Sequence, residues 1–340
     1  MKKLAAFLIA AALVVLALIG VRKVSEKENN AEEVIEVTEK QQTVSLNIAY
    51  MPNYAALWAV LTGIDQGYFA DEGLDLQLYE FADGPTEIAA MESGSIDLAY
   101  IGHGAHKLCI TGSAKIFAPQ QINTSDYVIG LKSHGVEKLE DLKGKKVAYA
   151  SGTSSEASLR SALEKVNLSF DDIEAYEMEV GNMVSAMASG TIDACATWSP
   201  YTMQITTQID DAVKIEFENG TTSLASWIAL PDYAEQNRDV LVRFSKALYK
   251  AMDFGSKEEN YEYVAGLVAK QTATDLEVNL FQTEDAEWFN SEKIKTGLED
   301  GTLKDDYVNQ QQTFLNAGAI EKEVPLEDYI LFDVIEEALR

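Results

Sequence analysis

The segment Gly152-Thr153-Ser154-Ser155-Glu156 has the residue types that could hold a negatively charged group. Hydroxyls and exposed backbone N–H groups at the start of a helix donate hydrogen bonds to anionic oxygen. The same segment also fits a capping box, in which Thr153 and Glu156 satisfy those N–H groups within the protein. From these residues alone capping is the simpler interpretation, although both roles can coexist.

Aromatic side chains follow in the segment Trp198-Ser199-Pro200-Tyr201. Trp198 and Tyr201 could stack on a flat ligand or form the wall around a small apolar group, and both would also fit a hydrophobic core. Tyr54 and Trp227 are weaker candidates, because each suits the apolar face of a helix or strand. We expect Trp198 and Tyr201 to be the main aromatic contacts and the other two to be secondary.

His103 and His106 are spaced so that one helix could present both to a metal ion, but no third histidine lies nearby. We therefore expect no metal and no cofactor. His103 would instead donate a hydrogen bond to a ligand, and His106 would pack against or cap the following helix. The sequence contains no Gly-x-Ser-x-Gly elbow, His-Glu-x-x-His motif or Walker loop, so an enzyme is not expected.

These candidates lie in two stretches of the chain that resemble each other. The stretch 88–100 returns as 184–196, where Met91, Gly94, Ile96 and Asp97 recur as Met187, Gly190, Ile192 and Asp193. A single repeat of this size predicts two equivalent lobes and not a solenoid. In each copy the order strand, helix, strand, helix, strand is typical of a parallel α/β sheet with covering helices.

Ligands of open α/β sheets bind beyond the carboxyl ends of the strands, so each copy nominates two loops. The loops are 52–54 and 102–104 in the first copy, and 152–155 and 198–201 in the second. Asp83-Gly84, between a strand and its helix, is a further candidate. The expected ligand contacts are Asn53, Tyr54, Asp83, Gly84, His103, Gly104, Gly152, Thr153, Ser154, Ser155, Trp198, Tyr201 and Trp227.

The N-terminus differs from the rest of the chain. Lys2-Lys3 precedes an apolar run from Leu4 to Val21, which fits an export signal and is about long enough to span a bilayer. Because a small-x-small cleavage site is poorly formed, we expect residues 1–21 to be an uncleaved membrane anchor, with a cleaved signal peptide as the alternative. The polar residues 22–43 are expected to form a flexible tether.

Composition restricts the function classes further. A chain of 340 residues with 47% hydrophobic content can bury one large core or two smaller ones. The formal charge of −28 argues against general binding to nucleic acid or anionic lipid. Cys109 and Cys195 are the only cysteines, and we expect two buried free thiols and no disulfide.

Six short motifs in order give the chain a family resemblance. They are Ile48-Ala49-Tyr50, 67–76, 91–97, 139–145, Gly152-Thr153 and 198–201. From about residue 45 to the C-terminus, the chain resembles the substrate-binding proteins of ABC importers for nitrate, sulfonates, taurine and thiamine-precursor pyrimidines. This resemblance strengthens the expectation that the 152–155 loop contacts ligand. A pyrimidine synthase resembles the same family, but its cysteine-rich motif is missing here.

The resemblance implies a type II periplasmic-binding fold of class α/β, with two α/β lobes joined by two crossing strands around a central ligand cleft. Residues 44–123 and 222–340 would form lobe 1, and residues 124–221 would form lobe 2. The crossings would lie near 120–128 and 219–227. Such a protein would be a monomer outside the cytoplasmic membrane, tethered to its outer face, or secreted or periplasmic if the signal is cleaved.

The same resemblance implies a solute-binding protein that closes about its hinge and hands a small molecule to an ABC permease and its ATPase. Two ligand classes stay open. The 152–155 loop favours an anion such as nitrate or a sulfonate, whereas Tyr54, His103, Trp198 and Tyr201 suit a heterocycle such as a pyrimidine. No arginine occurs in the candidate loops, which weakens a tightly paired sulfonate. The alternatives are a ligand-sensing ectodomain for a membrane signalling partner and a pyrimidine-precursor synthase.

Overall fold

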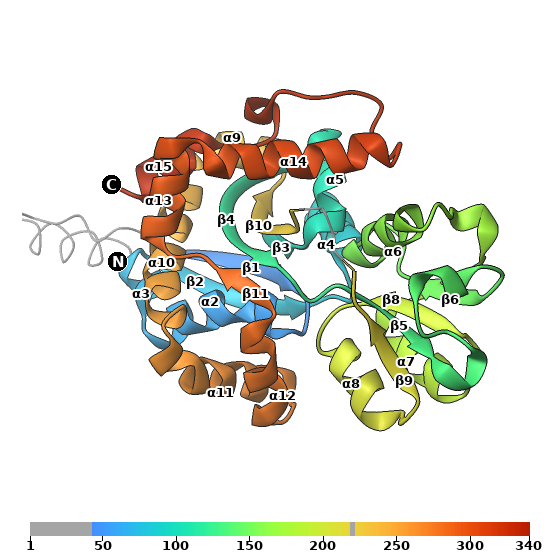
Figure 1. Ribbon diagram of the computed structural model, residues 1–340. Helices are drawn as coiled ribbons and strands as arrows, with labels where there is room; N and C mark the ends of the chain where they lie inside the picture. The colour runs from blue at the N-terminus through green and yellow to red at the C-terminus, as the bar shows by residue number, and fades with distance from the viewer. Residues whose placement is uncertain (1–42, 218–221) are drawn as a thin grey trace, which may run out of the picture. The chain divides into compact units, whose positions relative to one another are not determined.

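The computed structural model describes residues 43–217 and 222–340. The expected anchor, and all of the expected tether except Thr43, therefore lie outside the described residues. Within the described ranges, no helix is long and apolar enough to cross a membrane. These ranges contain two mixed β-sheets with helices packed around them, which we call lobe 1 and lobe 2 (Figure 1). The predicted α/β class with two lobes is confirmed.

Lobe 1 contains a six-stranded sheet in the order β11-β4-β10-β3-β1-β2. Its strands are β1 (Val44–Tyr50), β2 (Leu74–Glu80), β3 (Leu98–Ile101), β4 (Lys115–Asn123), β10 (Leu224–Ala229) and β11 (Ala286–Trp288). Strand β1 pairs in parallel with β2 and β3, while β10 runs antiparallel between β3 and β4. The carboxyl ends of β1, β2 and β3 therefore open on the same edge of the sheet.

Lobe 2 contains a five-stranded sheet in the order β7-β6-β8-β5-β9. Its strands are β5 (Tyr127–Leu131), β6 (Lys146–Tyr149), β7 (Glu174–Glu177), β8 (Ala194–Thr197) and β9 (Ala212–Ile215). Strand β6 pairs in parallel with β7 and β8, and β5 runs antiparallel between β8 and β9. Five neighbouring strands of lobe 1 have the same order and the same parallel and antiparallel pairings. The repeat in the sequence therefore corresponds to a repeated sheet arrangement.

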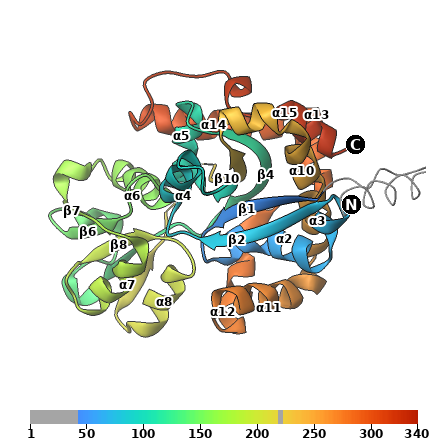
Figure 2. The ribbon, with the colours of Figure 1, turned by 180° about the vertical axis from the view of Figure 1, so that it is seen from behind.

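Helices pack around the sheets of both lobes (Figures 1 and 2). Lobe 1 has α2 (Tyr54–Asp65), α3 (Tyr68–Asp71), α4 (Gly84–Glu92), α5 (His106–Ile110), α9 (Pro231–Gln236), α10 (Arg238–Gly255), α11 (Tyr261–Thr272), α12 (Leu276–Phe281), α13 (Ser291–Asp300), α14 (Thr302–Asn316) and α15 (Phe332–Ala338). Lobe 2 has α6 (Ser154–Lys165), α7 (Val180–Ala188) and α8 (Tyr201–Gln208). The 3-10 helices are η1 (His103–Ala105), η2 (Lys132–His134), η3 (Leu139–Leu142), η4 (Phe170–Asp172), η5 (Glu258–Asn260), η6 (Gln282–Glu284) and η7 (Leu326–Asp328).

Each face of the lobe 2 sheet has its own hydrophobic core. Helix α6 contributes Leu159, Ala162 and Leu163 to one core. Helix α7 contributes Met183 and Met187 to the other, where they meet residues of β5 and β8. The spacing of apolar residues that predicts one buried face of α6 thus matches the packing.

The repeated sequence motif has two structural roles that are the same in both lobes. Gly94 and Gly190 follow α4 and α7 with φ of 78° and 66°, a left-handed conformation that glycine adopts without strain. Asp97 Oδ2 accepts a hydrogen bond from the backbone N–H of Asn47 at 2.7 Å, and Asp193 Oδ2 accepts one from Lys146 at 2.8 Å. The repeated glycine therefore ends a helix, and the repeated aspartate fixes the neighbouring parallel strand.

The chain passes between the lobes twice. The first crossing joins the end of β4 at Asn123 to the start of β5 at Tyr127. The second lies between the end of β9 at Ile215 and the start of β10 at Leu224, and residues 218–221 within it are not described. Short crossings of this kind are where a two-lobed protein can bend as a hinge.

Both cysteines are buried and free, as the sequence predicts. Cys109 lies in α5 of lobe 1, and Cys195 lies in β8 of lobe 2. Burial raises the pKa of the Cys195 thiol to about 12 and also raises that of Cys109. Because the thiolate is the reactive form, both thiols are expected to be inert toward labelling reagents.

The carboxyl group of Glu87, on α4, is buried. Its side chain is 0% exposed, and neither carboxyl oxygen has a hydrogen-bond partner within residues 43–217 and 222–340. Burial raises the pKa of Glu87 well above its usual value, and Asp83 adds to the effect. The folded protein therefore binds this proton more tightly than the unfolded chain does. The wild-type protein accordingly loses stability at this group as pH rises above the pKa of an unfolded-chain glutamate.

Replacing Glu87 with glutamine is expected to raise the free energy of unfolding by about 1–2 kcal/mol near pH 8, because the amide requires no proton uptake. The gain should shrink as the pH is lowered toward the ordinary pKa of a glutamate. Urea unfolding at both ends of this pH range measures it. The exposed Glu92 on the same helix provides the control variant Glu92→Gln. A gain of equal size at both pH values would contradict the assignment.

Candidate ligand-binding cleft

A cleft lies where loops from both lobes meet beyond the carboxyl ends of their strands. Asn53 lies in the loop that follows β1, and Gly104 lies in the loop that follows β3. From lobe 2, Thr153 lies in the loop after β6 and Trp198 in the loop after β8. The space in the cleft that water-sized molecules could occupy is about 50 Å³. It is smaller than the usual sites for small organic molecules, so a larger ligand would enter only when the lobes move apart.

The structure brings part of the predicted contact set to this cleft. The predicted residues that line it are Asn53, Gly84, Gly104, Thr153, Ser154 and Trp198. They come from all four loops that the repeat nominates and, for Gly84, from the first residue of α4. Contact between these residues and a ligand stays a prediction, because their position at the cleft does not by itself demonstrate binding.

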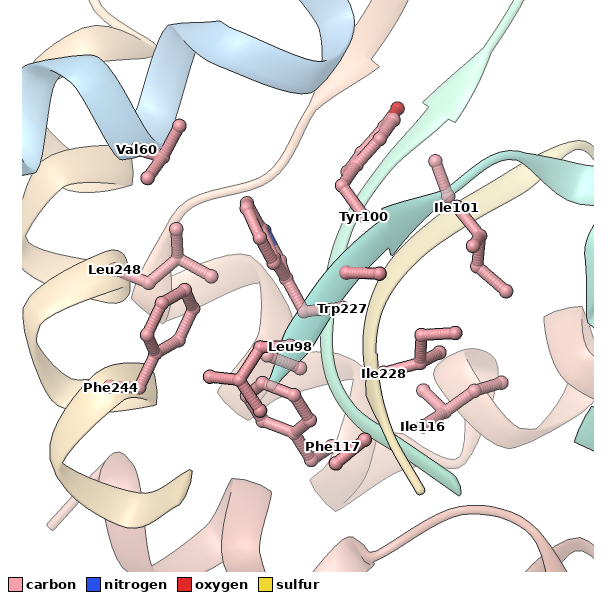
Figure 3. Packing of buried hydrophobic residues seen from close by; sticks show 14 of the residues in the cluster. Val60, Leu98, Tyr100, Ile101, Ile116, Phe117, Trp227, Ile228, Phe244 and Leu248 are labelled. Carbon is pink, nitrogen blue, oxygen red and sulfur yellow. The ribbon is translucent and has the colours of Figure 1, made fainter. Parts of the chain in front are cut away.

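Three predicted contacts instead belong to the interior of lobe 1, because their rings turn toward the core. Tyr54 is 1% exposed and packs edge-on against Trp288, with ring centroids 5.2 Å apart. Trp227 is 0% exposed in the main core (Figure 3). The ring of His103 stacks on Phe314 at 4.7 Å, and burial lowers its pKa to about 4, so the imidazole is neutral near pH 7.

The other predicted residues away from the lining use their polar or aromatic groups for local structure. Asp83 Oδ1 caps α4 by accepting a hydrogen bond from the backbone N–H of Thr86 at 2.9 Å. The Gly152 N–H donates to Glu156 Oε2 at 2.8 Å, and the Ser155 hydroxyl donates to the carbonyl oxygen of Ala196 at 2.7 Å. Tyr201 packs against Trp198 with ring centroids 6.3 Å apart. The polar groups of Asp83, Gly152 and Ser155 are thus engaged within the protein.

The predicted anion loop is capped by its own side chains. Thr153 Oγ1 accepts a hydrogen bond from the N–H of Ser155 at 3.2 Å and donates to the carbonyl oxygen of Ala150 at 2.7 Å. The Ser154 hydroxyl donates to Asp126 Oδ1 at 2.7 Å. A carboxylate of the protein therefore already lies at the start of α6, the place where an anion, one of the two ligand classes that the sequence leaves open, would bind.

The start of helix α2, at the opposite wall of the cleft, is capped in a similar manner. Asn53 Oδ1 accepts a hydrogen bond from the N–H of Ala56 at 2.8 Å, and Gln282 Oε1 accepts one from the N–H of Tyr54 at 3.2 Å. Two backbone donors that could hold an oxyanion, the N–H groups of Tyr54 and Ala56, are thus directed to protein oxygens. The starts of these helices therefore present fewer free hydrogen-bond donors to an anion than the sequence implies.

Two carboxylates that the sequence analysis missed also line the cleft, Asp126 and Asp285. Asp126 is in the first crossing between the lobes, and Asp285 lies between η6 and β11. The backbone N–H of Thr124 donates to the carbonyl oxygen of Asp285 at 2.8 Å, which holds the two segments together. Neither segment belongs to the repeat, so the comparison of the two copies gave no signal for them. Among the described residues that line the cleft, none is lysine, arginine or histidine.

Burial affects the acidity of both carboxyl groups. It raises the pKa of Asp126, an effect that the hydroxyls of Ser154 and Ser223 partly offset. Burial also raises the pKa of Asp285 to about 6, with the Ser199 hydroxyl and the Lys214 ammonium acting in the opposite direction. The two groups are also close enough for the charge of Asp126 to raise the pKa of Asp285.

The lobes are in direct contact at one side of the cleft. A Cβ atom added to Gly104 would lie 2.0 Å from the carbonyl carbon of Thr153 and 2.5 Å from the nitrogen of Ser154. Next to this contact, Lys107 Nζ of lobe 1 lies 4.0 Å from Glu156 Oε2 of lobe 2. The absence of a side chain at Gly104 is therefore what allows the two backbones to approach so closely.

His106 begins α5 and packs behind the cleft. Its Nδ1 lies 3.1 Å from the carbonyl oxygen of Gly102, and its Nε2 lies 3.1 Å from Ser226 Oγ. In the described part of the chain, no group of three or more His, Cys, Asp or Glu side chains is placed to hold a metal ion.

Comparison with known proteins places the chain among solute-binding proteins. The model of the NMT1/THI5-like family matches residues 55–258. A Brucella abortus protein named only as a binding protein is 28% identical, over 85% of this chain and 91% of that protein. A Bacillus subtilis protein named for binding aliphatic sulfonates is 26% identical, over 84% of this chain and 86% of that protein. These relatives are binding proteins, not enzymes.

A solved structure with the same fold is the alkanesulfonate-binding protein SsuA from Xanthomonas axonopodis pv. citri bound to MOPS. The two chains are 20% identical and align with a TM-score of 0.66, over 85% of this chain and 99% of that one. At this identity the likeness establishes the fold alone. It confirms the periplasmic binding protein fold that the sequence motifs imply.

Proposed function

This chain belongs to the NMT1/THI5-like family, and on that premise we propose that it captures a small solute outside the cytoplasmic membrane and delivers it to an ABC permease and its ATPase. The observation that carries the proposal is a cleft lined by both lobes. A ligand held there contacts Asn53 and Gly104 on one side and Thr153 and Trp198 on the other. Binding thereby favours the arrangement in which the lobes are close together.

Delivery requires that the permease distinguish the loaded protein from the empty one. Ligand contacts made only in the closed arrangement shift the population of lobe positions toward it. The two crossings, at 124–126 and between Ile215 and Leu224, are the places where the bending would occur. The predicted anchor at residues 1–21 would keep the protein near its permease.

Ligand binding should raise the melting temperature and make the protein more compact, because a solute bound to the closed form stabilises only folded protein. The full chain would be screened by thermal shift against sulfonates, nitrate, amino acids, amines, pyrimidines and flavins. The best ligand would then be tested by small-angle X-ray scattering, where a saturable decrease in the radius of gyration is expected. If no compound gives both effects, the proposed function fails.

A further inference from the structure

We propose that the cleft recognises its ligand through a cationic or strongly hydrogen-bond-donating nitrogen group, such as an amine or an amidine, held between the carboxylates of Asp126 and Asp285. This inference rests on the proposed solute-binding function and narrows its ligand class. It disfavours nitrate and simple sulfonates, which the capping of the helix starts also disfavours.

Asp126 is held in place by both lobes. Its Oδ1 accepts the hydroxyl of Ser154, at the start of α6 in lobe 2, at 2.7 Å. Its Oδ2 accepts the hydroxyl of Ser223, next to β10 in lobe 1, at 3.2 Å. An ionised carboxylate has about four lone-pair sites, so these two hydrogen bonds leave room for a donor from the ligand. The position of Asp126 in the crossing also lets ligand contact act on the hinge.

Asp285 and Ser199 are close enough for the Ser199 hydroxyl to lower the pKa of Asp285, but among the described residues neither group has all of its hydrogen-bonding capacity used at the cleft. Ser199 is 5% exposed, and its Oγ lacks a hydrogen-bond partner of ordinary geometry among the residues that the structure describes. Asp285 Oδ2 is likewise buried and without such a partner there. Buried polar atoms are costly to leave without a partner. A nitrogen group with two or more N–H donors could satisfy the carboxylate and the hydroxyl together.

Within residues 43–217 and 222–340, no lysine or arginine forms a salt bridge with either carboxylate, although Lys214 is close enough to lower the pKa of Asp285. Lys214 Nζ lies over the ring of Tyr127, 3.8 Å from its centroid, and among the described residues its contact within salt-bridge distance is Glu216, at 4.0 Å. Lys107 is next to Glu156 on the other side of the Gly104 contact. An oxyanion in the cleft would therefore be repelled by two carboxylates and would find no cation in the described lining. A cation would be attracted by the same two carboxylates.

The other walls of the cleft also suit a nitrogen cation. Trp198 and Tyr100 contribute aromatic surface, and Met51 and Pro85 contribute apolar surface. Aromatic faces attract amines and amidines through their π electrons, and apolar walls strengthen the attraction to a buried carboxylate. The overall charge of −28 would in addition draw a cation toward the protein from a distance.

Matched probes of opposite charge test the inference. The full chain would be titrated with benzamidine, phenethylamine and 4-aminopyrimidine, and with benzoate, benzenesulfonate and nitrate, by calorimetry and thermal shift. We expect saturable binding by at least one nitrogen probe and by no anion. Binding by anions only would overturn the assignment of charge and leave the proposed function standing. If neither these probes nor the wider solute screen gave binding, the proposed function would fail as well.

Variants then locate the contact. Asp285→Asn should weaken the best nitrogen probe by roughly 10-fold to 100-fold, the usual cost of removing one charge from a desolvated pair. Asp126→Asn should also weaken it. The exposed neighbour Glu284 gives the control Glu284→Gln, which removes the same formal charge and should change affinity less than 3-fold. Equal losses in Asp285→Asn and Glu284→Gln would show a general charge effect and contradict the site.

Measuring ligand affinity over a pH series distinguishes a direct ligand contact by Asp285 from a purely structural role of this residue. Its pKa of about 6 is set by burial, with Ser199, Lys214, Asp126 and Glu284 as the groups that act on it. Because the carboxyl must be ionised to hold a cation, affinity for the nitrogen probe should fall as pH drops below about 6. In Asp285→Asn this part of the pH dependence should disappear. An unchanged profile in the variant would overturn the assignment.

Discussion

Replacing Gly104 with alanine should hold the two lobes apart and abolish tight ligand binding. The added Cβ would lie 2.0 Å from the carbonyl carbon of Thr153 and 2.3 Å from its oxygen, far inside contact distance. These atoms belong to the backbone at the start of α6, so no side-chain rotation can make room for the methyl group. The lobes must separate at this point, and the ligand then loses contacts on one side.

The expected effect of Gly104→Ala is a loss of affinity of roughly 100-fold, because the apparent affinity falls in proportion to the population of the competent closed state. The stability of the protein without ligand should change little, since Gly104 is not among the glycines with positive φ and alanine can adopt its backbone conformation. Calorimetry with the best ligand of the screen measures the first effect, and urea unfolding measures the second.

Lobe separation can be measured directly with two spin labels. Lys165 in lobe 2 and Glu321 in lobe 1 are exposed, and the buried native cysteines should not react, so Lys165→Cys and Glu321→Cys give a specific pair. Ligand should shorten the distance between the labels in the parent protein and not in Gly104→Ala. The matched control is Gly266→Ala in α11, where an added Cβ meets nothing within 4 Å. Normal closure and affinity in Gly104→Ala would show that the lobes do not meet here.

The fold could be predicted from the sequence because its signals are local. Gly94 and Gly190 each end a helix in a conformation that favours glycine, and Asp97 and Asp193 each bind the backbone of a neighbouring strand. Interactions of this kind depend on short segments, so two copies of the fold retain two copies of the motif. The loops that the same reasoning nominates at the strand ends contribute residues to the lining of the cleft.

The side chains within those loops were harder to predict, because a loop position does not determine the direction of its side chain. Tyr54 begins α2 with its ring on the buried face, and His103 turns toward Phe314. Asp126 and Asp285 could not be predicted for a different reason, because their proximity depends on strand pairing. They approach each other only because β11 pairs with β4, with Ala286 opposite Asn123, and no local pattern reports such a long-range contact.

The capping of the helix starts shows why the ligand class was also difficult to infer. Thr153, Ser154 and Ser155 have hydroxyls that could bind an anion, and the sequence could not show how many were already engaged. The structure directs them to Ala150, Asp126 and Ala196, respectively. Because these three hydroxyls already donate hydrogen bonds within the protein, the carboxylates become the principal charged groups at the cleft. The site therefore offers a ligand mainly hydrogen-bond acceptors.

Replacing Trp227 with alanine should lower the free energy of unfolding by about 3–5 kcal/mol, the usual range for deleting a large buried aromatic side chain. Its indole lies between Phe244, at a centroid distance of 5.0 Å, and Tyr100, at 5.9 Å (Figure 3). Its N–H donates to Gln120 Oε1 at 2.7 Å, and Gln120 Nε2 donates to the carbonyl oxygen of Ala55 at 2.7 Å. The variant therefore leaves both a cavity and a buried amide oxygen without its donor.

Trp227→Phe separates this core role from the ligand contact that the sequence predicts. Phenylalanine fills most of the volume but cannot donate to Gln120, so we expect a loss of about 1–3 kcal/mol of stability without ligand. Ligand affinity should stay within a few-fold of wild type, because Trp227 reaches the cleft only indirectly, through Tyr100 and through Gln120 bonded to Ala55. Urea unfolding and calorimetry on the same preparations provide both numbers. Unchanged stability together with a large loss of affinity would instead make Trp227 a direct ligand contact.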